Sequence, residues 1–573
     1  MFLPASQEEM KRLGWDRADV VLVTGDAYVD APQSGAAVIG RVLAAAGFRV
    51  GIIAQPDVST DADIRRLGEP RLFWGVTSGC VDSLVANRTA LGKRIRSDDF
   101  TPGGENNRRP DRAVIKYANL IRAAFSGTAP IVLGGLEASL RRFSHFDAWP
   151  GSVRRSILFD AKADLLVYGM GERAALSIAR AMDEGRDWAG IPGTCLAMAE
   201  APPGSLTLPS HEAVRSDPAL FAEAFGLFSE NQLPESPVLC QRQDTRFLVQ
   251  YPPAAPPTQA ELDQWNELPY MRDAHPLDAR QGEVRALATI RFSITSHRGC
   301  FGDCRFCAIS THQGRQVVSR SPESVVREAQ RLAGLPGFTG IISDLGGPTA
   351  NMYGTRCKKH GVAGACSDRS CLFPEPCPHL AFGHRRHGDL LARVADLPGV
   401  RKTFVASGVR HDLVLADPKG PEYLARVLER HLSGQMKIAP EHCAPQVLSL
   451  MGKPGPEGLL HFRELYGDIN ARLGRDQFLT YYFMAAHPGC SRTDMEALSR
   501  FVRRELAVVP RQVQIFTPTP GTWSTCMFHT GRDPEGQKIF VERTEKGRAA
   551  QKACLGIPKG KGSRGKGRGG RGR

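Results

Sequence analysis

The feature that most constrains the fold is the alternation of short apolar segments with helical ones in the first part of the chain. Apolar strands separated by helices favour a parallel sheet that is covered on both faces. Several of these strands run into glycine, as at Gly25, Gly134 and Gly169, and ligands of such sheets bind at the carboxyl ends of the strands. Strands are expected at 19–24, 48–54, 72–77, 130–133 and 164–168, and helices at 36–46 and 112–125.

A second run of alternating segments follows between residues 289 and 528. Ser321 and Pro322 give a helix-start signal, because serine caps a helix and proline suits its first turn. Six strand–helix units suit a partial (β/α)6 barrel, in which chemistry gathers at the carboxyl ends of the strands. The expected strands are 290–295, 340–344, 402–406, 436–439, 478–485 and 512–517.

Three cysteines follow the first of these barrel strands. Cys300, Cys304 and Cys307 have the spacing C-x3-C-x2-C. Three thiolates can hold three corners of a [4Fe–4S] cluster, because its irons favour sulfur ligands. An electron-transfer cluster takes a fourth cysteine, and the local motif lacks one. The spacing therefore predicts a cluster with one open iron, which can bind a small molecule.

A second cysteine group follows the second barrel strand and comprises Cys357, Cys366, Cys371 and Cys377. Four thiols in so short a span can form a zinc site or a second iron–sulfur cluster, and a metal would give this polar segment a reason to fold. The alternative is an irregular loop with reduced thiols. The remaining cysteines are expected to be small buried hydrophobic residues, namely Cys80, Cys195, Cys240, Cys443, Cys490, Cys526 and Cys554.

Charge and targeting signals bear on partners and location. The net charge is +14, and much of the excess lies in the glycine- and arginine-rich tail at 558–573. This tail is expected to be disordered, and it either binds RNA or another polyanion or only keeps the chain in solution.

No apolar run is long enough to span a bilayer and no secretory signal is apparent, so we expect a cytoplasmic protein that does not bind membranes. Fourteen cysteines then indicate metal or redox chemistry.

The cysteine triad, with Phe306 before its third member, resembles the signature of the radical S-adenosylmethionine (SAM) superfamily. The resemblance implies that SAM chelates the open iron and is cleaved by one electron to methionine and a 5′-deoxyadenosyl radical. It also implies that Phe306 lies near the adenine. Gly346 and Gly347 follow the second barrel strand and resemble the motif that contacts the amino group of SAM. The implied electron donor is a flavodoxin or a ferredoxin.

Five further stretches resemble the YgiQ family of radical SAM proteins, and the likeness covers nearly all of the chain before the basic tail. The family implies the fold and the cofactors but names no substrate. The stretches are 23–30, 98–104, 134–142, 343–353 and 437–442.

The first sheet resembles the Rossmann-like, cobalamin-binding domains of the superfamily. Their signature is Asp-x-His-x-x-Gly, and the nearest stretch here runs from Asp30 to Gly35 with Pro32 at the histidine position. Proline cannot ligate cobalt, so cobalamin is expected to be unlikely. The expected domains are a Rossmann-like domain (1–200), a linker (201–285), a radical SAM barrel (286–530) and a C-terminal extension with the disordered tail (531–573).

The sequence therefore predicts a radical SAM enzyme that abstracts hydrogen from an unknown substrate. His442 and His487 follow the fourth and fifth barrel strands and could handle protons or bind substrate, although a structural role is the more usual one for such a histidine. One alternative is methylthiolation or methyl transfer to RNA or protein. Another is a non-catalytic iron–sulfur or zinc protein that binds nucleic acid.

Overall fold

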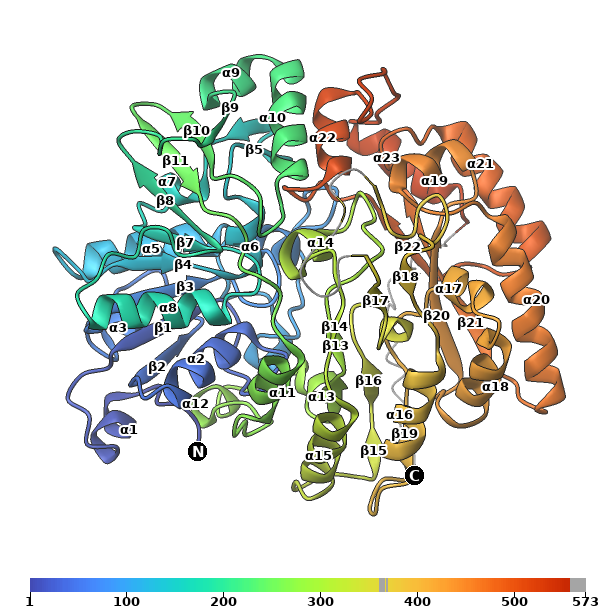
Figure 1. The fold of residues 1–573 in the computed structure, drawn as a ribbon, viewed down its shortest axis with the longest axis horizontal. Helices are drawn as coiled ribbons and strands as arrows, with labels where there is room; N and C mark the ends of the chain where they lie inside the picture. The colour runs from blue at the N-terminus through green and yellow to red at the C-terminus, as the bar shows by residue number, and fades with distance from the viewer. Residues whose placement is uncertain (360–365, 367–368, 557–573) are drawn as a thin grey trace, which may run out of the picture.

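The computed structural model describes residues 1–359, 366 and 369–556. Two lobes lie side by side (Figure 1). The first lobe is built on one large sheet, and the second on the strands between residues 293 and 515. The basic tail predicted at 558–573 lies outside the described residues. Within the described part of the chain, no helix is long and apolar enough to cross a membrane.

The first lobe confirms the expected α/β fold with a mostly parallel sheet. Within the described residues the sheet has nine strands, in the order β2-β1-β3-β4-β7-β8-β11-β10-β9. The first five are parallel, and β8, β11 and β10 follow as antiparallel neighbours. The strands are β1 (Val20–Thr24), β2 (Val50–Ala54), β3 (Phe73–Thr77), β4 (Ile131–Leu133), β7 (Leu165–Val167), β8 (Thr194–Met198), β9 (Leu206–Leu208), β10 (Leu239–Gln243) and β11 (Arg246–Gln250).

Helices cover both faces of this sheet, which explains why its strands are apolar throughout. Along β1, Val20 and Leu22 pack with α2 (Gly35–Ala45) and α8 (Glu172–Asp183) on one face. Val21 and Val23 belong to the core on the other face, with α5 (Ala113–Ala124). Side chains alternate across a strand, so a strand buried on both faces needs a continuous apolar run.

The expected linker at 201–285 is not merely a connection, because it contributes β9, β10 and β11 to the sheet. These strands carry buried glutamines, which makes them look polar in sequence. The side-chain oxygen of Gln241 accepts a hydrogen bond from the Ser144 amide at 3.0 Å, and that of Gln243 accepts one from the Ser156 amide at 2.9 Å. The glutamines are therefore satisfied by neighbouring backbone rather than by water.

In the second lobe a strand lies within or across each of the six expected segments. The second one is divided at Ser343 into β15 and β16, so that β16 pairs with β12 and β15 pairs with β19, both in parallel. β20, β21 and β22 form a parallel set. The helix signalled by Ser321 is α15 (Pro322–Ala333), whose cap is the Ser321 hydroxyl. The strands are β12 (Ser293–Thr295), β15 (Ile341–Ile342), β16 (Asp344–Gly346), β19 (Lys402–Thr403), β20 (Gln435–Glu441), β21 (Phe478–Ala485) and β22 (Gln512–Ile515).

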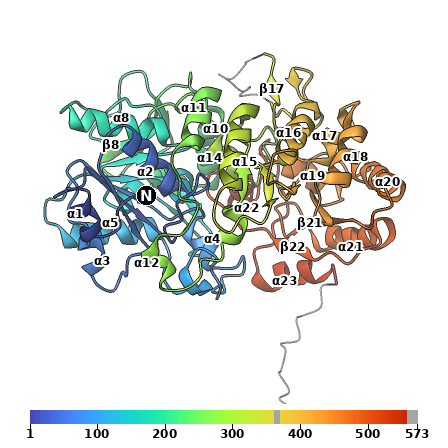
Figure 2. The same ribbon diagram turned by 90° about the horizontal axis from the view of Figure 1, so that it is seen from below.

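The lobes meet where the carboxyl edge of the first sheet packs on α14 (Ala308–Gln313) of the second lobe. Helix α6 (Gly135–Leu140), which follows β4, contacts α14, and the two lie beside each other in Figure 1. The Ser139 hydroxyl lies 3.0 Å from Nδ1 of His312. A buried ion pair joins Glu172 of α8 to Arg298, just before the cysteine triad. Figure 2 shows α14 between the two lobes from below.

Candidate functional site

The cysteine triad lies on a loop between a short strand, β13 (His297–Arg298), and α14. Cys307 is the N-terminal cap of α14, and its amide donates a hydrogen bond to the Cys304 carbonyl at 2.9 Å. Arg305, between them, is anchored to both sides: its amide donates to the Met451 carbonyl at 3.0 Å and its carbonyl accepts from the Ser524 amide at 2.9 Å. The loop is therefore held in shape by the rest of the second lobe.

Backbone and charge surround the sulfur atoms of this loop. The Gly302 amide donates to Sγ of Cys300 at 3.3 Å. Gly302 has no room for a side chain, because a Cβ there would lie 2.8 Å from Nη1 of Arg410 and 3.1 Å from Sγ of Cys300. Nη1 of Arg410 also lies 3.9 Å from Sγ of Cys304. Arg410 pairs with Asp412 at 2.5 Å and is thereby fixed beside the thiols. Arg410 follows the third expected barrel strand (402–406), and the sequence indicated no role for it.

The thiols lie in surroundings that disfavour a free thiolate. Burial, with the neighbouring Cys304, raises the pKa of Cys300, and the same causes raise the pKa of Cys307 to about 12. Without a metal these two side chains are therefore neutral at neutral pH. Iron binds thiolates, so binding of a cluster must displace their protons.

The predicted SAM motif lies next to the triad, and its glycines contact protein groups as well. Gly346 ends β16, and a Cβ on Gly347 would lie 2.5 Å from Cε1 and 2.6 Å from Nε2 of His297. The His297 ring is held by the Ser296 hydroxyl at 2.9 Å and the Thr349 carbonyl at 3.1 Å. The Thr349 hydroxyl lies 3.7 Å from Sγ of Cys300. The glycine motif is thus connected to the cysteine loop through this ring and Thr349.

The two candidate histidines occupy structural positions. Burial lowers the pKa of His487 to about 3 and that of His442 to about 4, so both rings are neutral. Nε2 of His487 lies 2.7 Å from the Ser524 hydroxyl, and Nδ1 of His442 accepts from the Ala444 amide at 3.0 Å. The ring of Phe306 meets His487 edge to face at 6.3 Å. These contacts favour the structural interpretation of both histidines.

Glu441, at the carboxyl end of β20, is a residue near the cysteine loop that sequence reasoning missed. Its φ of +68° lies in the left-handed region, which is strained for a residue other than glycine and occurs often at functional sites. Burial raises the pKa of its carboxyl group, although the nearby charge of Lys453 acts to lower it. Glu441 in turn contributes to the raised pKa of Cys307. The signal in the sequence was the run Pro440–His442 after the fourth strand, of which only His442 was considered.

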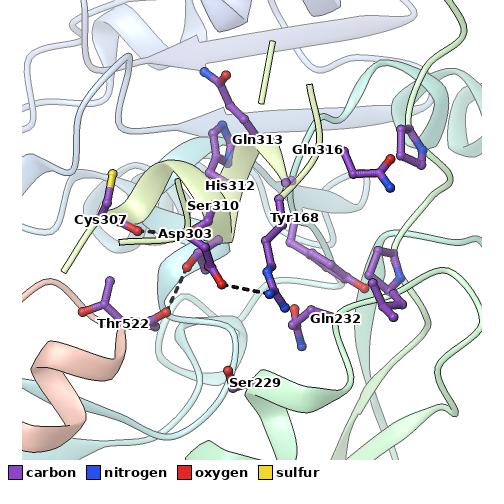
Figure 3. A pocket seen from close by; sticks show the side chains of 18 of the residues that line it. Tyr168, Ser229, Gln232, Asp303, Cys307, Ser310, His312, Gln313, Gln316 and Thr522 are labelled. Carbon is purple, nitrogen blue, oxygen red and sulfur yellow. Dashed lines mark hydrogen bonds and ion pairs between the residues drawn. The ribbon is translucent and has the colours of Figure 1, made fainter. Parts of the chain in front are cut away.

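A cavity of about 540 Å³ lies at the junction of the lobes, and we call it the junction pocket. Figure 3 shows its lining side chains, with Tyr168, Ser229 and Gln232 from the first lobe facing Cys307 and Thr522 of the second. This volume is typical of pockets for small molecules. Cys304 and Cys307 of the triad lie in its wall, together with most of α14.

The four cysteines of the second group also lie around a single cavity. Cys357, Cys366, Cys371 and Cys377 line a cavity of about 60 Å³. Burial raises the pKa of Cys371 to about 11, and the other three cysteines contribute to that rise. Among the described residues, however, no three histidine, cysteine or carboxylate side chains converge closely enough to hold a single metal ion.

Of the other seven cysteines, Cys195, Cys240, Cys490 and Cys526 are buried, whereas Cys80, Cys443 and Cys554 are partly exposed. The expectation that all seven are buried therefore holds for four of them. Within the described part of the chain none of the cysteines forms a disulfide.

One solved structure shares the fold, and a second shows a weaker likeness. The cobalamin-dependent SAM radical enzyme OxsB with aqua-cobalamin bound matches with a TM-score of 0.50 and 11% identity over 91% of this chain, which spans only 56% of OxsB. The radical SAM methyltransferase TsrM from Kitasatospora setae, with cobalamin and a [4Fe-4S] cluster bound, matches with a TM-score of 0.46 and 17% identity over 94% of this chain and 81% of TsrM.

The match to OxsB overturns the expectation that cobalamin is unlikely, because a chain of this fold carries aqua-cobalamin. That expectation depended on one missing ligand, whereas a corrinoid is held by contacts along its whole ring. In this structure Pro32 is buried, and its neighbour Gln33 donates to the Ser293 carbonyl at 3.2 Å. Pro32 has no side-chain donor atom, so it offers cobalt no ligand.

Family models and relatives agree with this fold. The Radical SAM N-terminal model matches residues 2–293, and the Radical SAM superfamily model matches residues 294–502. A UPF0313 protein of Fusobacterium nucleatum is 51% identical over 96% of this chain and 98% of its own length. Another, of Methanocella arvoryzae, is 49% identical over 96% and 92%.

The matches decide between the function classes left open by the sequence. They show an enzyme of the radical SAM class rather than a non-catalytic iron–sulfur or zinc protein, and they confirm the resemblance to the YgiQ proteins. The chain belongs to the UPF0313 family of radical SAM proteins.

Proposed function

We propose that the protein holds a [4Fe–4S] cluster on Cys300, Cys304 and Cys307, binds SAM at the open iron, and abstracts hydrogen from a substrate in the junction pocket. The observation that carries the proposal is the place of the cysteine loop. It follows the first parallel strand of the second lobe, and its Cys304 and Cys307 line the 540 Å³ pocket. We take the second lobe as a partial (β/α)6 barrel and the first as a Rossmann-like domain of the cobalamin-binding type.

The residues of the loop suit such a cluster. The set supplies three thiolates, which leaves one iron for SAM. A cluster with thiolate ligands carries net negative charge, and the Arg410 guanidinium and the Gly302 amide lie where they stabilise it. When bound, the cluster supplies the electron that cleaves SAM to methionine and a 5′-deoxyadenosyl radical.

The other residues around the loop then orient SAM. The backbone at Gly346 and Gly347 approaches it, since neither residue has a side chain in the way. The Phe306 ring gives the adenine an apolar surface. The carboxyl group of Glu441, buried near Cys307, accepts hydrogen bonds from the ammonium group or hydroxyls of SAM.

The junction pocket suits a small substrate that must be kept from water. Phe225 and Trp523 meet edge to face at 4.9 Å in its wall, and Nε1 of Trp523 donates to the Ser229 hydroxyl at 3.0 Å. Excluding water protects a reactive radical from side reactions. Arg305 and Arg369 also line the cavity, so we infer a substrate with an anionic group. A flavodoxin or ferredoxin of the cytoplasm is the proposed electron donor.

The test is release of 5′-deoxyadenosine from SAM by the reduced protein, reconstituted and assayed without oxygen. The wild-type protein should release it, and Cys304→Ala should not, with loss of the charge-transfer absorption that the cluster on the triad contributes. Cys554→Ala is the matched control, because Cys554 lies at the end of α23 (Glu545–Ala553), away from the triad, and should leave release unchanged. Normal release by Cys304→Ala would refute the assignment.

A further inference from the structure

The second cysteine group, Cys357, Cys366, Cys371 and Cys377, is placed by ordinary backbone structure. Cys357 ends β17 (Arg356–Cys357), which pairs antiparallel with β18 (Leu380–Ala381). The Cys377 amide donates to the Cys371 carbonyl at 2.8 Å, and the Leu380 amide donates to the Cys377 carbonyl at 2.8 Å. These short turns bring sulfur atoms from separate parts of the segment to the walls of the 60 Å³ cavity.

Few apolar side chains pack within this segment. Its core cluster is small, and several of its members are the cysteines themselves. Cys357, Cys371 and Cys377 pack there with Phe301 and with Cys300 of the triad. Four thiols around one cavity in so small a core are the pattern of a metal group that supplies folding free energy.

The spread of the sulfur atoms and the size of the cavity favour one kind of metal group over another. Zinc needs its four sulfur ligands about 2.3 Å from one point. No three metal-ligating side chains of the described residues converge in that way. The triad does not converge so closely either, as expected for ligands of a cluster, which is wider than one ion. A single water needs only ~10–15 Å³ of such space, so a cavity of about 60 Å³ has room for several atoms.

We propose that Cys357, Cys366, Cys371 and Cys377 bind a second iron–sulfur cluster beside the first. With four thiolates this cluster is closed, so it binds no SAM and leaves no iron free to carry a sulfur for transfer. The site therefore gives no support to methylthiolation as the reaction of this protein. Lys359 and Arg369 line the same cavity, so their positive charges lie close to the negative charge that such a cluster would carry.

The position of the second cluster gives it a role at the junction pocket. Arg369 lies in the walls of both cavities, and Ser370 and Phe373 of the same segment line the junction pocket. Arg315 joins the segment to the cysteine loop, because its Nη2 lies 2.9 Å from the Asp303 carboxylate and donates to the Arg369 carbonyl at 3.0 Å. The closed cluster fixes this wall of the pocket proposed for the substrate.

The test compares metal content in proteins purified without oxygen. A variant with Cys300, Cys304 and Cys307 all changed to Ala should keep iron and sulfide at about half the wild-type amount, with no zinc. The pair Cys371→Ser with Cys377→Ser should lose the other half and keep a cluster whose electron paramagnetic resonance spectrum changes with SAM. Cys443→Ala, a partly exposed cysteine outside both groups, should keep the full amount.

A second measurement avoids dependence on how the variants fold. Mössbauer spectroscopy of iron-57 in the wild-type protein should resolve two clusters in equal amounts, of which only one responds to SAM. Zinc in place of the second cluster, or a single cluster that responds fully to SAM, would overturn the proposal. Because the readout is metal content, failure here is distinct from failure of SAM cleavage.

Discussion

Gly347→Ala tests the placement of SAM against the glycine motif. The added Cβ would lie 2.5 Å from Cε1 of His297, far inside normal contact. The ring cannot turn away without losing its hydrogen bond to Ser296 or to the Thr349 carbonyl, at about 1 kcal/mol. Overpacking of this kind costs about 1–3 kcal/mol. The combined strain of at least about 2 kcal/mol is relieved when the backbone at 346–347 moves away from the ring.

If that backbone contacts SAM, the shift must be reversed on binding, and SAM affinity should fall roughly 30-fold, because 1.4 kcal/mol corresponds to a factor of ten. Calorimetric titration of SAM into the reconstituted protein measures this, with iron content determined on the same sample. Gly467→Ala is the control, because Gly467 lies in α20 (Glu457–Arg472) of the same lobe with nothing within 4 Å of an added Cβ. Equal SAM affinity in the two variants at equal iron content would show that Gly347 makes room for the His297 ring and does not contact SAM.

Three further predictions concern buried charge. Burial lowers the pKa of His312 to about 4, below its value in the unfolded chain. The neutral ring therefore contributes up to ~3 kcal/mol of stability, which is complete above about pH 6.5 and is lost as the pH falls toward 4. His312→Gln should remove this contribution to the pH dependence of urea unfolding, measured across that range. Glu172→Gln leaves Arg298 buried without its counter-charge and should destabilise the protein by about 3–5 kcal/mol, whereas the same change at the exposed Glu184 should alter urea unfolding by less than about 0.5 kcal/mol. Glu441→Gln should slow 5′-deoxyadenosine release at least roughly tenfold with unchanged iron content, and an unchanged rate would remove Glu441 from the SAM site.

The sequence predicted the five parallel strands of the first sheet and the strand segments of the second lobe well, because burial on two faces demands apolar runs. The triad, which follows β12 in the chain, could be recognised from the sequence because the spacing of three cysteines needs no knowledge of contacts. The sequence missed the strands from β8 to β11 in the same sheet. In β10, the polar side chains of Gln241 and Gln243 are satisfied only by tertiary hydrogen bonds.

Arg410 and Glu441 were missed for a different reason. Each follows a different strand, and only the folded chain brings both close to the cysteine loop. The judgement on cobalamin was wrong because one histidine was treated as the whole site, although a large ligand is held by many contacts.

The buried ion pairs between the lobes bear on how such a gene can be shortened or recombined. Arg298 pairs with Glu172, and Arg272 pairs with Glu328, so each pair joins residues from opposite sides of position 285. A fragment that began there would leave Arg298 without its counter-charge and Glu328 with only one of its two arginine partners, Arg320. Exchange of one half between distant relatives would succeed only where both pairs are kept. The two halves are therefore expected to be inherited, and to be produced in the laboratory, as one unit.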